Sequence, residues 1–132
     1  MILKPFFTYF RGKYRAAPHY PRPEYPVIVG PFAGAAGYSL RYPDRKIILV
    51  EKNKRIAALW RWLIRASKDD VLCIPTWKKE FESVDDIPCP PEARDLVGFW
   101  LNKGSVMPGK TPSAWMRGGS RPRSYWGPEI LS

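Results

Sequence analysis

The sequence predicts an α/β fold, and three observations lead to that prediction. Two short runs of aliphatic residues, 27–29 and 46–51, are typical of buried strands. A glycine-rich stretch, GPFAGAAG at 30–37, separates them, and a segment with helical periodicity, NKRIAALWRWLIRASK at 53–68, follows the second run. Strands and helices in this order indicate a parallel pair of strands joined by a right-handed crossover.

Length and composition favour one folded domain. The chain has 132 residues, of which 45% are hydrophobic and 14% aromatic, which is enough for a core and too apolar for a disordered chain. No apolar run approaches the roughly 20 residues of a membrane span, and the N-terminus does not resemble a signal peptide. Two cysteines and one histidine are too few for a structural zinc site, so no metal is expected. A cytoplasmic protein without membrane association is expected.

The elements around the glycine-rich stretch follow from local signals. Four prolines in PHYPRPEYP, at 18–26, predict an extended segment before the first strand. Within the stretch a helix is expected to begin near Ala35 and to end at Pro43. Asn53 is the expected N-cap of the helix after the second strand. Trp60 lies on the apolar face of that helix and is expected in the core.

The C-terminal half gives weaker signals. VLCIP at 71–75 is interpreted as either a third short strand or the start of a loop, and residues 76–93 are expected to be mostly irregular. PPEARDLVGFWLNKG at 90–104 predicts a helix that begins with proline and ends at Gly104. Residues 105–132 are a glycine-, proline- and arginine-rich tail, so the chain divides into an α/β part at 1–104 and this tail.

The glycine-rich stretch and the acid Glu51 indicate a nucleoside ligand. Ligands bind open α/β sheets at the carboxyl ends of the strands, where glycines allow the backbone to approach closely. Glu51 ends the second predicted strand, and its carboxylate can accept hydrogen bonds from both ribose hydroxyls. The glycines do not match GxGxxG, which disfavours a nicotinamide-binding protein. A tight strand–helix junction with a surface glutamate is the alternative interpretation of the same residues.

Three motifs in order carry a family resemblance. KPFFTYFRGKYR at 4–15, GPFAGAAGYSLRY at 30–42 and ILVEKN at 48–53 resemble the N-terminal half of Dam-like adenine-specific DNA methyltransferases, in particular the phage-borne forms. The resemblance implies a partial Rossmann-like fold, S-adenosylmethionine as cofactor and methylation of the exocyclic amine of adenine in double-stranded DNA. It also implies a bacterial or phage-infected host as the setting.

The resemblance assigns cofactor binding residue by residue. The matching positions are Tyr9, Gly12, Lys13, Pro31, Phe32, Ala33, Gly34, Gly37 and Glu51. Two positions depart from the family: Arg11 replaces the first glycine of Gly-Gly-Lys, and Gly30 replaces the acid before Pro-Phe-Ala-Gly. Loss of a charged hydrogen bond at position 30 is expected to weaken cofactor binding by roughly ten- to a hundredfold.

The catalytic motif of this family, Asp-Pro-Pro-Tyr, is missing. The nearest sequence is CPPE at 89–92, which has no carboxylate or amide before the prolines and no aromatic ring after them. No catalytic residue is therefore assigned, and we expect a truncated form that is inactive alone or needs a partner chain that supplies the missing half. A parallel sheet cut in this way is expected to expose a strand edge and an apolar face.

The charge indicates a polyanionic partner. The formal net charge is +10, a balance that favours nucleic acid. In the tail, arginines and aromatic rings alternate, and DNA contacts are expected at Arg117, Arg121, Arg123, Tyr125 and Trp126. A non-catalytic nucleic-acid-binding remnant, or a subunit of a larger enzyme, is therefore the alternative function.

Overall fold

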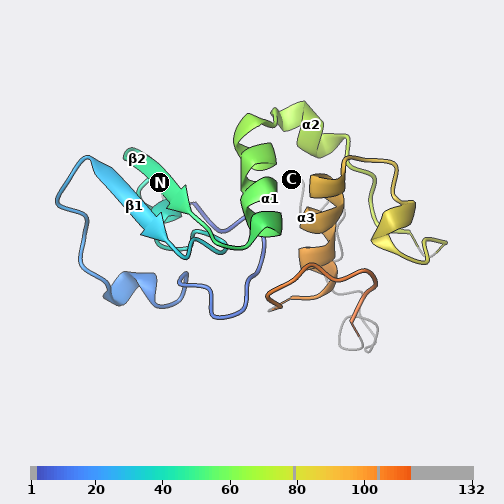
Figure 1. Cartoon of the computed structure of the whole chain (residues 1–132), viewed down its shortest axis with the longest axis horizontal. Coiled ribbons are helices and arrows are strands. Elements are labelled where there is room, and N and C mark those ends of the chain that lie inside the picture. The colour runs from blue at the N-terminus through green and yellow to red at the C-terminus, as the bar shows by residue number, and fades with distance from the viewer. Residues whose placement is uncertain (1–2, 79, 104, 114–132) are drawn as a thin grey trace.

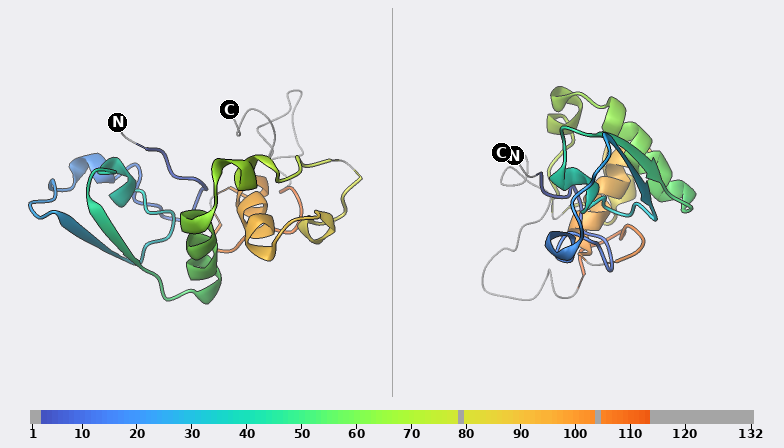
Figure 2. Two further views of the ribbon diagram at one scale, coloured as in Figure 1. Left: turned by 90° about the horizontal axis from the view of Figure 1, so that it is seen from above. Right: turned by 90° about the vertical axis from the view of Figure 1, so that its left-hand side faces the viewer.

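The computed structural model describes residues 3–78, 80–103 and 105–113, and Figure 1 shows their arrangement. Its strands are β1 (Val27–Pro31) and β2 (Lys46–Val50), and its α-helices are α1 (Lys54–Arg65), α2 (Lys68–Leu72) and α3 (Pro91–Leu101). The two strands lie at one end, α1 follows them in the middle, and α3 lies beyond α1 (Figures 1 and 2). Three 3₁₀ turns complete the described elements: Ala17–His19, Ser39–Arg41 and Val84–Asp86.

The two strands form a parallel sheet. Ile28 lies opposite Ile47, and Gly30 lies opposite Leu49. The predicted parallel pair and the α/β class are therefore confirmed, with β1 two residues longer than expected and β2 ending one residue earlier. Since successive side chains alternate between the two faces of a strand, these four residues share one face, which turns toward the rest of the chain.

The opposite face of the sheet is apolar and open. Val27, Val29, Ile48 and Val50 are between 40% and 57% exposed. Parallel sheets are usually covered on both faces, because their strands are apolar on both sides. In the described part of the chain each strand has one neighbour, so the expected exposed edge and exposed apolar face are both confirmed.

The core lies between α1, α3 and the N-terminal segment. Phe7 and Phe99 are almost fully buried, with ring centroids 4.8 Å apart. Trp60 is 6% exposed, which confirms its predicted place in the core. The helices are also joined by Arg55, whose guanidinium donates two hydrogen bonds to Asp95 at 2.9 and 2.7 Å. An ion pair with two parallel hydrogen bonds is stronger than an ion pair with one.

The prediction of a helix from Ala35 to Pro43 is wrong, because the structure has only the 3₁₀ turn Ser39–Arg41 in this segment. Gly34 and Ala36 have φ angles of 50° and 54°, in the left-handed region. A right-handed helix cannot run through residues in that conformation, so the segment turns instead of coiling.

The helix predicted at 53–68 is confirmed as α1, which ends three residues earlier than expected. Asn53 caps α1 as expected, since its side chain accepts a hydrogen bond from the backbone N–H of Arg55 at 3.0 Å. The helix ends at Arg65, and Ser67 begins α2 through a capping box with Asp70. The chain at 71–75 is therefore the end of α2 followed by a loop, and the third strand is not formed there.

The last predicted helix is confirmed with a shorter end. α3 begins at Pro91, and Asn102 is its C-cap. Gly104, the expected cap, lies outside the described residues. Of the described residues between 76 and 90, Val84–Asp86 form a 3₁₀ turn and the others are irregular, as expected. α1 has 12 residues, and the described segments contain no helix with the length and apolar character needed to cross a membrane.

Asn53→Ala is expected to lower the free energy of unfolding by about 1 kcal/mol, because the first turn of α1 loses its side-chain acceptor. Urea unfolding followed by circular dichroism measures this as a lower midpoint at an unchanged slope. Lys52→Ala, at an exposed neighbouring position, is the control. Equal midpoints for the two variants would contradict a structural role for the cap.

Candidate functional site

The turn at 32–34, which follows β1, is held by side chains from three other segments. Lys13 donates from Nζ to the carbonyl of Phe32 at 3.0 Å. The backbone N–H of Gly34 donates to Oε2 of Glu51 at 2.9 Å. Trp60 donates from Nε1 to the carbonyl of Gly34 at 2.6 Å. The N-terminal segment, the end of β2 and helix α1 therefore meet at one turn.

Gly34 is required at this turn for two reasons. Its φ of 50° is rarely adopted by residues with a side chain. A Cβ at this position would also lie 2.9 Å from Cδ1 of Tyr9, so the tyrosine ring packs directly on the glycine. Burial raises the pKa of Tyr9, and the negative charge of Glu51 raises it further. The phenol is therefore neutral at physiological pH.

Glu51 lies one residue beyond β2, and both carboxylate oxygens accept backbone hydrogen bonds. Oε2 accepts from Gly34, and Oε1 accepts from Asn53 at 3.0 Å. An ionised carboxylate has about four lone-pair sites, so about two are left to accept from a ligand. The strand–helix junction and the ribose-binding acid, which are alternatives at the level of sequence, are thus compatible roles for one side chain.

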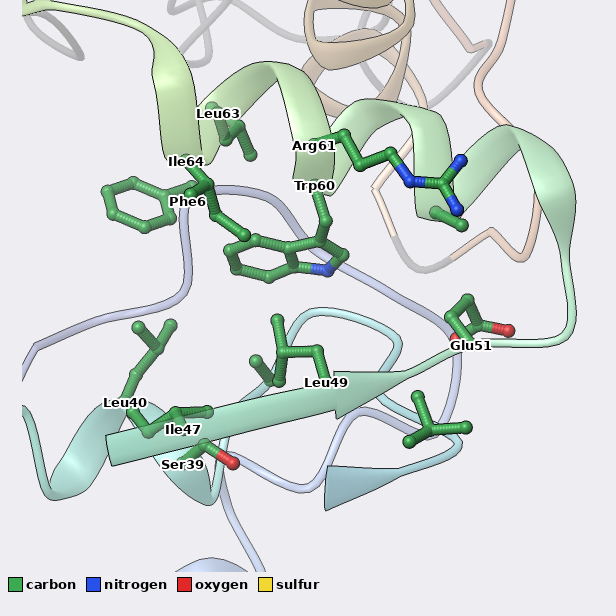
Figure 3. Close-up of a pocket in the computed structure, with 13 residues that line it drawn as sticks. Phe6, Ser39, Leu40, Ile47, Leu49, Glu51, Trp60, Arg61, Leu63 and Ile64 are labelled. Carbon is green, nitrogen blue, oxygen red and sulfur yellow. The ribbon is translucent and has the colours of Figure 1, made fainter. Parts of the chain in front are cut away.

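A mainly apolar groove of about 690 Å³ lies beside Glu51, between β2 and α1. Figure 3 shows the indole of Trp60 extending from α1 toward Leu49 of β2, with Glu51 beyond the end of the strand. Leu63 and Ile64 continue the apolar wall along α1. The groove can bury a flat apolar group while the carboxylate at its end accepts hydrogen bonds.

Five of the predicted cofactor-binding residues are brought together at the turn. They are Tyr9, Lys13, Phe32, Gly34 and Glu51, although the Phe32 side chain itself is 77% exposed and only its carbonyl takes part. Pro31 is the last residue of β1, and Ala33 is buried, with its N–H donating to the carbonyl of Val50 at 3.1 Å.

Two predicted glycines have structural roles beside the turn. Gly12 closes a turn of the N-terminal segment by donating to the carbonyl of Tyr9 at 2.9 Å. Gly37 lies against the backbone of Tyr14, where a Cβ would approach its nitrogen to 2.4 Å. Both glycines therefore shape the path of the segment that carries Lys13, and neither lines the groove beside Glu51.

Sequence reasoning assigned Trp60 to the core and missed its role at the turn. The available signal is chemical, because a buried indole N–H needs a hydrogen-bond acceptor. Arg61, the next residue of α1, also lines the groove near Glu51. No feature of the sequence indicates that the adjacent residues Trp60 and Arg61 both line this groove.

The remaining candidate groups are a cysteine and residues outside the described part of the chain. Burial raises the pKa of the half-buried Cys89, so its thiol stays protonated and unreactive. The predicted DNA contacts at Arg117, Arg121, Arg123, Tyr125 and Trp126 lie outside the described residues. Among the residues that the structure does describe, no group of three histidine, cysteine or acidic side chains is placed to hold a metal.

Comparisons with known proteins give no match: no family model, no curated protein and no solved structure is similar to this chain.

Proposed function

We propose that the chain binds S-adenosylmethionine, with the nucleoside in the groove between β2 and α1 and the ribose hydroxyls on Glu51. In this proposal the chain is the cofactor-binding part of a Rossmann-like, adenine-specific DNA methyltransferase. The observation that carries it is the position of Glu51: a carboxylate with acceptor capacity left over, at the carboxyl end of a parallel strand and at the end of an apolar groove.

The groove has the size and chemistry of a small-molecule site. Its volume of about 690 Å³ lies within the range of roughly 300–1,000 Å³ that ligand pockets occupy. Trp60 and Leu49 supply apolar surface for an adenine ring, and Glu51 supplies the oriented polar contact. A surface glutamate without a ligand-binding role would not need this apolar surface beside it.

Lys13 suits the amino-acid end of the same ligand. Its ammonium uses one of three donors on the carbonyl of Phe32, which leaves two for a carboxylate. When bound, S-adenosylmethionine supplies a methyl group on a sulfonium that an amine can attack. The residues of this chain would bind and orient the cofactor, and we propose that the amine and its catalytic loop come from a partner chain or domain.

Titration calorimetry of S-adenosylmethionine into the full chain tests the proposal. Binding to the wild type, with a loss of at least about tenfold in Glu51→Ala, is expected because the ligand loses a charged acceptor. Glu24→Ala, which removes an exposed acid elsewhere, is the control and is expected to bind like the wild type. No binding by a folded wild-type chain would contradict the proposal.

Glu51→Ala also removes the acceptors of Gly34 and Asn53, so a ligand-side change separates binding from folding. S-adenosylhomocysteine and its 2′,3′-dideoxy analogue are compared on the wild type and on Glu51→Ala. If Glu51 holds the ribose, the analogue binds more weakly than the parent only to the wild type. An equal loss for both proteins would place the hydroxyls elsewhere.

The second candidate is a nucleic-acid-binding protein without a cofactor, which the net charge of +10 favours. A folded chain that binds DNA with strong salt dependence but does not bind S-adenosylmethionine would support it. Methyl transfer that appears on adding a chain with Asp-Pro-Pro-Tyr would support the subunit form of the first proposal instead.

A further inference from the structure

A second cavity, of about 710 Å³, lies along the N-terminal segment and shares no lining residue with the groove. Three parts of the chain form its walls: residues 4–15, the glycine-rich stretch at Ala35 and Gly37, and Lys103 just after α3. The close packing of Gly37 on Tyr14 brings the first two parts together. We call it the N-terminal pocket.

The N-terminal pocket is strongly positive. Its lining contains Lys4, Arg11, Arg15 and Lys103, and none of the described residues that line it is an aspartate or glutamate. Lys4, Arg11 and Arg15 are exposed, and none of these three forms an ion pair with a residue that the structure describes. By contrast, Arg55 and Lys110 are paired with Asp95 and Asp85. The charges of Lys4, Arg11 and Arg15 are therefore available to a ligand.

Two of the cations lie beside aromatic rings. The guanidinium of Arg11 is 5.3 Å from the ring centroid of Phe10, and the ammonium of Lys103 is 5.2 Å from that of Trp100. A ring restrains a cation without neutralising it. Arg11 also has a φ of 55°, a conformation that costs free energy at a non-glycine residue and that clusters at binding sites.

We propose that the N-terminal pocket binds the phosphates of a single nucleic-acid strand, with a base stacked on the exposed ring of Tyr14. Guanidinium and ammonium groups bind phosphate, and Arg11 and Arg15 can each donate two hydrogen bonds to one phosphate group. Aromatic rings beside such cations are the common arrangement for single strands. Four cations that line one cavity of about 710 Å³ favour a ligand with several phosphates over one small anion. The inference does not depend on cofactor binding.

The test is the anisotropy of a fluorescein-labelled oligothymidylate titrated with the full chain at several salt concentrations. The triple variant Lys4→Gln/Arg11→Gln/Arg15→Gln is expected to bind at least about tenfold more weakly. Its log–log salt slope is expected to be shallower by about 2, because up to three phosphate contacts of about 0.7 each are lost.

The charge-matched control is Arg22→Gln/Lys46→Gln/Lys68→Gln, which removes three exposed cations from other parts of the chain. It is expected to change the affinity by less than about threefold, since these residues do not line the pocket. Equal losses for the two triple variants would show a general cationic surface and overturn the proposal. An unchanged affinity in the pocket variant would overturn it as well.

Tyr14→Leu tests the stacked base, and tripolyphosphate serves as the probe without a base. The substitution is expected to weaken oligothymidylate binding by at least about fivefold and to leave tripolyphosphate competition unchanged. If both probes weaken alike, or if tripolyphosphate binds as tightly as the oligonucleotide, the ligand is not a nucleic-acid strand. Thermal unfolding of each variant confirms that the compared chains are folded.

Discussion

Trp60→Ala is expected to lower the free energy of unfolding by about 3–5 kcal/mol, the largest effect of any single change proposed for this chain. Trp60 is 6% exposed and lies 5.8 Å, centroid to centroid, from the Phe7 ring. Its removal leaves a cavity in the core and deprives the Gly34 carbonyl of its donor. Because small domains are stable by only about 5–15 kcal/mol, the variant is expected to lose a large fraction of its free energy of unfolding.

Two further variants separate the causes of that loss. Trp60→Phe keeps much of the packing and removes the hydrogen bond to Gly34, so a loss of about 1–2 kcal/mol is expected. Trp62→Ala changes a partly buried tryptophan of the same helix that makes no such bond in the described structure, and a smaller loss than for Trp60→Ala is expected. Guanidinium unfolding monitored by circular dichroism measures all three. If Trp62→Ala loses as much free energy of unfolding as Trp60→Ala, the packing and the hydrogen bond of Trp60 do not stabilise the fold more than a partly buried tryptophan does.

The sheet and α1 could be predicted because their signals are local. The aliphatic runs give the strands, and Asn53 followed by apolar residues at helical spacing gives the helix. The position of Glu51 at the end of β2 follows from the same patterns. The exposed apolar face is expected only from the resemblance, as that of a sheet cut short. The aliphatic runs alone predict buried strands, and this is wrong for one face, because Val27 and Val29 are 40% and 57% exposed.

The path of the glycine-rich turn could not be predicted, because it depends on distant residues. Lys13 and Trp60 hold the turn from positions 19 and 26 residues away in the sequence. The left-handed conformation at Ala36 contradicts the local preference of alanine, which favours helix. In contrast, the capping box of Ser67 and Asp70 can be recognised in the sequence. It is missed because the apolar pattern of 53–68 is interpreted as one helix that continues through Ser67.

Gly37→Ala is expected to lower the free energy of unfolding by about 3 kcal/mol, at the upper end of the range for overpacking. The new Cβ would lie 2.4 Å from the backbone nitrogen of Tyr14 and 2.7 Å from its Cα. A backbone cannot rotate away as a side chain can, so one of the two segments must move. The measurement is urea unfolding of the wild type and the variant under the same conditions.

Gly30→Ala is the matched control for Gly37→Ala, because its new Cβ would meet Oγ of Ser39 at 3.2 Å and can be accommodated by a small shift. A change within about 1 kcal/mol is expected there, since the strain is offset by the lower entropy of the unfolded chain. Equal losses of free energy of unfolding at the two glycines would show that the close contact with the Tyr14 backbone is not the cause of the loss at Gly37.

The consequences of Gly37→Ala also reach both proposed sites. The segment that Gly37 holds in place carries Lys13 to the turn and carries Arg11 and Arg15 to the N-terminal pocket. A variant that is still folded is therefore expected to bind both S-adenosylmethionine and oligothymidylate more weakly, whereas Glu51→Ala is expected to weaken only the first. Loss of a single ligand in Gly37→Ala would mean that the segment does not position the two sites together.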